Sequence, residues 1–101
     1  MRVISKRPFN DAKKKFPNDA KALESTYQTL SKGVFKTPEE LKAVFGSLDN
    51  YKHKEKWYVI DIGGNNLRLL AAIQFVHQRM YIKHIVTHAE YDKITEKDAR
   101  G

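Results

Sequence analysis

The sequence predicts an α+β protein, with helices first, then an antiparallel sheet and then a short C-terminal helix. Apolar residues recur at helical spacing within the first 45 positions. Three apolar runs follow at 57–62, 67–76 and 80–86, and residues typical of turns separate each run from the next. Helices and strands that occupy separate stretches of the chain are typical of α+β folds rather than of folds in which they alternate.

The composition is that of a folded protein with one core. The chain has 101 residues, which predicts one domain over residues 1–101. Hydrophobic residues make up 41% and charged residues 31%, which favours a soluble globular protein over a disordered one. No apolar run approaches the roughly 18 residues needed to span a bilayer. The absence of cysteine excludes disulfides, thiolate nucleophiles and Cys-containing zinc sites, and we expect a cytoplasmic protein.

The charge of the chain points to an acidic partner. The formal net charge is +7, and thirteen of the nineteen Lys and Arg residues lie within the first 60 positions. A basic surface of this kind is typical of proteins that bind nucleic acid or acidic proteins. A solvated basic face without a partner accounts for the same numbers.

A helical hairpin is predicted after a brief strand at positions 3–4. The first helix should begin at Pro8 and end at Pro17. Asn18 is the expected N-cap of the second helix, and Gly33 is its expected C′ residue. Apolar residues repeat at helical spacing in both helices, at Phe9, Ala12 and Phe16 in the first and at Ala20, Leu23, Tyr27 and Leu30 in the second.

Two capping boxes predict the remaining helices. The sequence Thr-Pro-Glu-Glu at 37–40 predicts a short third helix that ends at Gly46. Residues 47–50 then have the composition of a turn. The pattern recurs as Thr-His-Ala-Glu at 87–90, where the final helix should begin.

The sheet is expected to be a meander around a central strand. Gly63–Asn66 predicts a hairpin turn, and Leu67–Val76, apolar on both faces, predicts a strand buried on both sides. Arg68 interrupts this strand, and because burying an unpaired guanidinium is costly it requires an acidic partner or a cleft open to an anion. His84 shares a predicted strand face with apolar neighbours in Met80–Val86, so we expect it in the core.

Cations alternate with other residues between positions 51 and 56. In an extended strand the three lysines of this stretch would lie on one face about 6.6 Å apart, which suits a nucleic-acid backbone. An edge strand that uses lysine to prevent aggregation would look the same. The lysine run at 13–15 likewise fits either phosphate contacts or a solvated helix face. The residues expected to contact RNA are Lys52, Lys54, Lys56, Lys13 and Lys14.

The histidines do not have the spacing of a metal site. His84 and His88 are four residues apart, which is a chelating distance only within one helix, and they fall on a predicted strand and a helix start about 10 Å or more apart. Gly63–Gly64 lacks the P-loop pattern, and no GxSxG sequence supports a serine nucleophile. We therefore predict no metal and no cofactor.

The remaining chemistry is cleavage of RNA by its own 2′-OH. Such a reaction needs a base for the 2′-OH proton, cations for the charge on the phosphorus-centred transition state and an acid for the 5′ leaving oxygen. Arg68, Lys54, Lys56, His88 and Tyr91 can supply these groups. Histidine serves as base or acid near neutral pH, whereas tyrosine is better suited to proton donation.

Three motifs in order after the basic hairpin resemble the HigB toxin family of the RelE/ParE toxin superfamily. They are SLDNY at 47–51, GGNNLR at 63–68 and THAEYD at 87–92. The resemblance covers nearly the whole chain and implies a RelE-like fold, with the N-terminal helical hairpin packed on a small antiparallel sheet. It further implies ribosome-dependent cleavage of mRNA. The implied partner is a HigA-like antitoxin with a helix-turn-helix domain, which would also assemble the complex into a higher oligomer.

By position in these motifs, Arg68 would stabilise the phosphate, while His88 and Tyr91 would serve proton transfer or base stacking. Catalytic sets differ across the superfamily, so the identity of the general base stays open. Two other functions fit the same residues. One is a toxin of this fold that poisons DNA gyrase, as ParE-like members do, and the other is a non-catalytic basic module that binds RNA.

Overall fold

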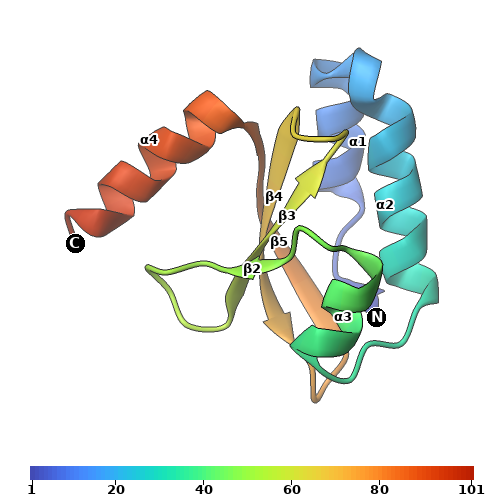
Figure 1. Cartoon of the computed structure of the whole chain (residues 1–101). Helices are drawn as coiled ribbons and strands as arrows, with labels where there is room; N and C mark the ends of the chain where they lie inside the picture. Colours follow the sequence, from blue (N-terminus) through green and yellow to red (C-terminus); the bar gives the residue numbers. More distant parts are fainter.

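The computed structural model describes all 101 residues and confirms the α+β class. Two helices pack on one face of a sheet, and the C-terminal helix projects from the opposite face (Figure 1). No helix combines the length and the apolar character that a membrane span requires. The helices are α1 (Arg7–Lys15), α2 (Ala20–Lys32), α3 (Pro38–Val44) and α4 (His88–Ala99), with a short 3₁₀ helix, η1 (Pro17–Asp19), before α2.

The sheet has five strands in the order β1-β5-β4-β3-β2. Strands β2 to β5 form the predicted antiparallel meander, but β1 runs parallel to β5, so the sheet is mixed rather than wholly antiparallel. The strands are β1 (Arg2–Val3), β2 (Asp49–Asn50), β3 (Trp57–Ile62), β4 (Leu67–Gln74) and β5 (Arg79–Thr87). Central strand β4 is buried along its hairpin face, but on the opposite face only Leu70 is buried, so the predicted burial on both sides holds there at one residue only.

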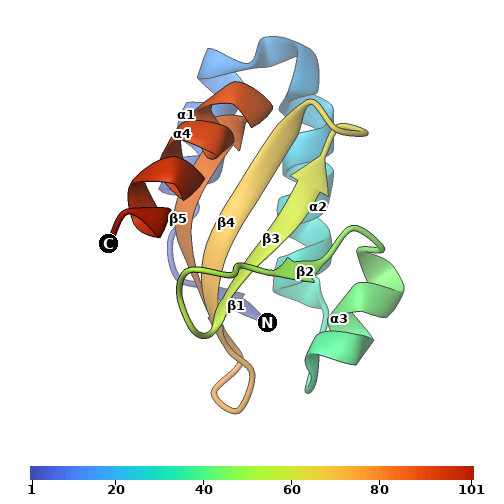
Figure 2. The same cartoon turned by 60° about the vertical axis from the view of Figure 1, so that its left-hand side comes forward.

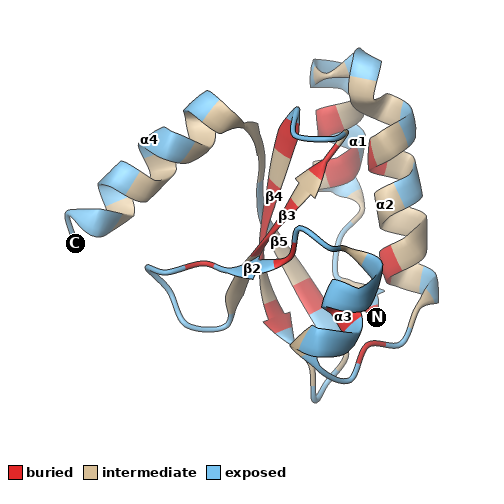
Figure 3. Ribbon diagram, viewed as in Figure 1, coloured by how far each residue is buried: buried red, intermediate tan, exposed pale blue.

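The main core lies between the sheet and the α1–α2 hairpin, where buried residues concentrate (Figure 3). Its fully buried side chains include Phe9, Leu23 and Leu69. A second and smaller cluster lies on the opposite face and consists of Tyr51, Val59 and Leu70, with Tyr91 and Ile94 of α4 packed against it. No residue of α4 is itself buried. We call this second surface the α4 face.

Two predicted helix ends differ in detail. Asn18 does not cap α2, because η1 precedes the helix and places Asp19 at the N-cap position. The Asp19 carboxylate instead accepts a hydrogen bond from the Asn66 side chain in the β3–β4 turn, at 3.0 Å. Gly33 ends α2 at φ −87°, in extended backbone, so left-handed geometry is not the reason for glycine there. A Cβ at Gly33 would lie 2.5 Å from the Phe35 ring.

The stretch predicted as a lysine-bearing strand is a loop. Asp49–Asn50, predicted as part of a turn, forms β2, and the chain then turns through residues 52–56 before β3 begins. Lys56 has φ +64°, which no extended strand accommodates, and the amide of Tyr51 donates to the carbonyl of Trp57 across the loop at 2.9 Å. The three lysines therefore do not form one straight row.

A bulge in β5 overturns the expectation for His84. Leu70 pairs with His84 while the next residue, Ala71, pairs with Ile82, so Lys83 is the extra residue. The bulge moves His84 from the face of Met80 and Ile82 to the α4 face. His84 is exposed there and is not a core histidine.

Candidate active site

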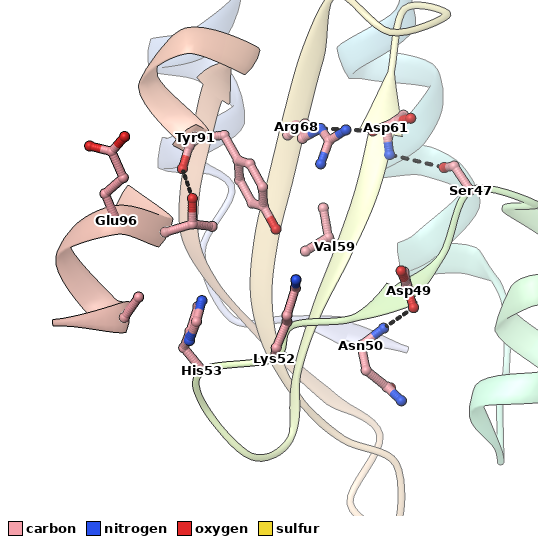
Figure 4. A pocket seen from close by; sticks show the side chains of 12 residues that line it. Ser47, Asp49, Asn50, Lys52, His53, Val59, Asp61, Arg68, Tyr91 and Glu96 are labelled. Atoms are coloured by element: carbon pink, nitrogen blue, oxygen red, sulfur yellow. Dashed lines mark hydrogen bonds and ion pairs between the residues drawn. The ribbon is translucent and has the colours of Figure 1, made fainter. Parts of the chain in front are cut away.

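A cleft of about 630 Å³ opens on the α4 face between β3, β4, α4 and the 51–56 loop (Figure 4). Arg68 rises from β4 at one end of it. Tyr91 projects into it from α4, and Glu96 of the same helix lines its edge with the carboxylate turned outward, while Lys52 and His53 line it from the loop. Three elements that are distant in the sequence thus supply one site.

Arg68 is the centre of the polar contacts. Its Nε lies 3.4 Å from the Asp61 carboxylate on β3 and also 3.4 Å from Nε2 of His88, to which it donates a hydrogen bond. The guanidinium carbon lies 4.7 Å from the centroid of the Tyr91 ring, a cation–π distance. With 29% of its side chain exposed, Arg68 has both an acidic partner and access to the cleft.

Tyr91 lies in the first turn of α4, with its ring against Arg68 and its hydroxyl directed into the cleft (Figure 4). Burial raises the pKa of this hydroxyl, and Asp49 and Asp92 act in the same direction, while the Arg68 guanidinium opposes them. The group is therefore protonated at neutral pH, so it can donate a proton but is a poor base.

His88 is the first residue of α4, and the predicted capping box fixes this helix start. The Thr87 hydroxyl accepts from the Glu90 amide, and the Glu90 carboxylate accepts from the Thr87 amide. His88 lies outside the set of residues that line the cleft. Its Nε2 instead accepts from Arg68, so His88 contacts the cleft through the arginine.

The candidate lysines are divided between two sides of the molecule. Lys52 lines the cleft, whereas Lys54 and Lys56 border an adjoining hollow beside Trp57. Lys13 lies on the hairpin side, where its ammonium forms an ion pair with Glu24 at 2.5 Å. Lys14 is exposed on the same helix.

The cleft also contains residues that the sequence did not single out. Asp61 pairs with Arg68, and its position was implied by the hairpin register, since a turn at 63–66 places residue 61 opposite residue 68. His53 reaches the cleft through the loop, where its ring packs edge-on against Tyr51 at 5.5 Å. No sequence pattern indicated this, because it depends on the turns of the loop.

Tyr51 connects the loop to α4. Its side chain is buried, its ring stacks on Trp57 at 5.9 Å, and its hydroxyl donates to the Asp98 carboxylate at 2.5 Å. The far end of α4 is thereby attached to the wall of the cleft.

The charges in the cleft are mixed. The lining includes the cations Lys52 and Arg68 and three carboxylates, those of Asp49, Asp61 and Glu96. A phosphate that approaches Arg68 must therefore compete with Asp61 for the guanidinium. No group of three or more His, Cys, Asp or Glu side chains is arranged to hold a metal ion.

The comparisons with known proteins agree with the motifs. The model of the HigB toxin family, described as the RelE-like toxic component of a toxin-antitoxin system, matches residues 19–94. The chain belongs to the HigB toxin family. The matched region contains all of the cleft-lining residues named above except Glu96, and membership of a toxin-antitoxin family implies an antitoxin partner.

Named relatives of this HigB toxin family member match over nearly its full length. The chain is 54% identical over 95 residues to "mRNA interferase HigB" of Escherichia coli O6:H1. The matched residues cover 94% of the chain and 92% of the relative. It is 45% identical over 95 residues to "mRNA interferase toxin HigB" of Escherichia coli K12, which covers 94% of the chain and 91% of the relative. The "mRNA interferase HigB" of Shigella flexneri matches with the same identity and coverage.

Proposed function

We propose that this member of the HigB toxin family is an endoribonuclease that cuts mRNA during translation on the ribosome. The observation that carries the proposal is the setting of Arg68, whose guanidinium meets the cleft beside a protonated phenol and an imidazole. The relatives named mRNA interferases support the substrate class.

The proposed reaction is attack of the RNA 2′-OH on its neighbouring phosphorus. A bond forms between the 2′ oxygen and phosphorus while the bond from phosphorus to the 5′ oxygen breaks, which leaves a 2′,3′-cyclic phosphate and a 5′-OH. Arg68 and Lys52 stabilise the charge that develops on the phosphate oxygens. RNA supplies the nucleophile itself, so the chemistry requires no metal ion and no cofactor.

Tyr91 is assigned as the acid that protonates the departing 5′ oxygen, because its hydroxyl is directed into the cleft and a tyrosine is protonated at neutral pH. The base is a histidine. His53 lines the cleft, where the 2′-OH would lie, whereas His88 is outside the lining and its Nε2 accepts from Arg68, so His88 serves as base only if that bond breaks. Substituting each by alanine in turn distinguishes them, since only the base should shift the acidic limb of the pH–rate profile.

The lysines and the partners complete the proposal. Lys52, Lys54 and Lys56 hold the RNA backbone beside the cleft, and Lys14 contacts phosphates on the hairpin side. Lys13 joins such a contact only by leaving Glu24. The antitoxin is a HigA-like helix-turn-helix protein that assembles the complex into a higher oligomer, and the toxin acts in the cytoplasm.

The test is to induce the protein in cells and to map the ends of one reporter mRNA, with and without a functional start codon. We expect growth arrest and new 5′ ends within the translated message only. Arg68→Ala should reduce cleavage by about 100-fold or more, and Tyr91→Phe by about 100-fold, since the ring remains over Arg68 and only the hydroxyl is lost.

Tyr58→Phe is the matched control, because it removes a hydroxyl from the opposite face of the sheet. Full activity of Tyr91→Phe would exclude proton donation by Tyr91. Intact transcripts in arrested cells would overturn the nuclease assignment, and arrest with induction of DNA repair would favour a gyrase inhibitor. Cleavage that does not depend on Arg68 or Tyr91 would place the chemistry elsewhere.

A further inference from the structure

A row of aromatic and basic side chains lies on the α4 face beside the cleft. The strand register places Trp57 on β3 opposite Ala72 on β4, and Ala72 opposite Tyr81 on β5, so these three side chains share one face. The small Ala72 side chain lies between the two aromatic residues, all three of which are partly exposed. Neighbouring strands are about 4.8 Å apart, so the two aromatic residues are about 10 Å apart across the sheet.

Two lysines converge on these rings. The ammonium of Lys54 lies 4.6 Å from the centroid of Trp57, and that of Lys83 lies 5.6 Å from Trp57 and 6.0 Å from Tyr81. Neither lysine forms an ion pair, in contrast to Lys13 and Lys15 on the hairpin side. The bulge in β5 is what exposes Lys83 here, because it makes this residue the extra one in the strand.

No helix covers this part of the face. In Figure 2, α4 lies in front of the upper part of β5 at one side of the sheet, and the 51–56 loop passes in front of the lower part of the sheet. Gln74 and Arg79, the next pair of β4 and β5 residues on the same face, are also exposed. The row therefore adds one more cation, and the one carboxylate that lines the hollow beside Trp57 is that of Glu55 in the loop.

From this arrangement we infer that the aromatic row is a nucleotide-binding subsite for single-stranded RNA, with a base stacked on the Trp57 ring face that does not stack on Tyr51 and its phosphates held by Lys54 and Lys83. Basic grooves with exposed aromatic rings bind single strands in this way, because every base has a face that can stack. The inference deepens the proposed function, on which it rests, by assigning a second contact to the RNA strand cut beside Arg68.

The position of the subsite determines which nucleotides of the RNA it binds. Ala72 lies four positions after Arg68 on β4, which is about 13 Å along the β-strand. The cleft and the subsite therefore engage different nucleotides of one RNA strand. The 51–56 loop lies between them, with Lys52 bordering both the cleft and the hollow beside Trp57 and Lys54 bordering that hollow alone. Contacts at the subsite should thus affect RNA binding without supplying a group to the reaction.

Trp57 is the only tryptophan of the chain, so its fluorescence reports directly on stacking. The probe is a 12-mer RNA that carries 2′-O-methyl groups at every position and therefore cannot be cut. The full chain should show quenching on titration with this strand. An abasic strand with the same number of phosphates should cause much less quenching, because it has no bases to stack.

Variants separate stacking from charge. Lys54→Gln combined with Lys83→Gln should weaken binding about 10-fold and make the slope of log Kd against log salt shallower by about 1.4, at about 0.7 per lost phosphate contact. The matched control is Lys21→Gln combined with Lys93→Gln, which removes the same charge from exposed sites outside the row and should change neither value as much. With a labelled strand, Trp57→Leu should lose about 10-fold in affinity and Trp57→Phe much less.

Equal quenching by the abasic strand, or equal loss in the two lysine pairs, would overturn the subsite. Quenching by the purified antitoxin and not by RNA would identify the row as a protein-binding face instead. Failure of the proposed function is separable from these outcomes. If the subsite is wrong, Arg68→Ala still abolishes cleavage in cells while the RNA titration shows no stacking, and if the nuclease assignment is wrong, stacking occurs without cleavage.

Discussion

Asp61→Asn should strengthen RNA binding, because it removes the group that competes with phosphate for Arg68. The carboxylate lies 3.4 Å from Nε of Arg68, and the two side chains are 24% and 29% exposed. An ion pair at this exposure contributes about 1 kcal/mol, which corresponds to about a fivefold change in an equilibrium constant. Asparagine has the same shape and keeps the backbone hydrogen bond from residue 61 to Ser47. We therefore expect about fivefold tighter binding.

The assay is a titration of non-cleavable 2′-O-methyl RNA at constant salt, by fluorescence anisotropy of a labelled strand. Glu96→Gln is the matched control, since it removes one negative charge from the same cleft but breaks no ion pair with Arg68. Its charge is exposed and screened, so its effect should stay below about twofold at physiological salt. Unchanged or weaker binding of Asp61→Asn, or the same gain in both variants, would refute competition at Arg68.

Three further predictions concern stability. Tyr51→Phe removes the hydrogen bond to α4 and should lower the free energy of unfolding by about 1 kcal/mol in urea titrations. Burial, and then the carboxylate that it contacts, raises the Tyr51 pKa above 10, so this difference should persist below pH 10 and fade only as pH rises past the raised value. Hydrogen bonds from its neighbours lower the Glu24 pKa to about 2, so Glu24→Gln should lower the Tm at pH 7. That difference should vanish as pH falls from about 4.5 towards 2, and a constant difference would contradict it. Gly33→Ala should cost about 1–3 kcal/mol because its methyl group meets the Phe35 ring, whereas Gly46→Ala, with open space around it, should cost less.

The sequence predicted correctly the helix starts and turns that depend on residues close together in the chain. Thr37 and Thr87 each accept from the amide three residues on, and the predicted capping box is complete at Thr87, whereas Glu40 accepts from the Lys36 amide instead of that of Thr37. The turn at 63–66 has the positive φ angles expected of Gly63 and Gly64. The prediction that Arg68 needs an acid or a cleft followed from the cost of burying its charge, and both are present.

The remaining features depend on contacts between distant residues. Alternating lysines look the same in a strand and in a loop, and the loop results from burial of Tyr51 against Trp57 and from the positive φ of Lys56. The bulge at Lys83 involves no glycine or proline, so nothing in the composition indicates that His84 changes face.

One face of the sheet contributes most of the stability, and the other carries the cleft. The hairpin side holds a cluster of 15 buried residues, whereas the α4 face holds only 3, so most of the apolar burial that stabilises the fold lies away from the cleft. Arg68 and Asp61 lie on strands of that stable sheet, but Tyr91 lies on a helix with no buried residue of its own. Elements with so little burial open at low cost in free energy. The position of Tyr91 over Arg68 therefore depends on few contacts, chiefly Ile94 and the bond from Tyr51 to Asp98, and changes at these contacts should reduce cleavage more than they reduce stability.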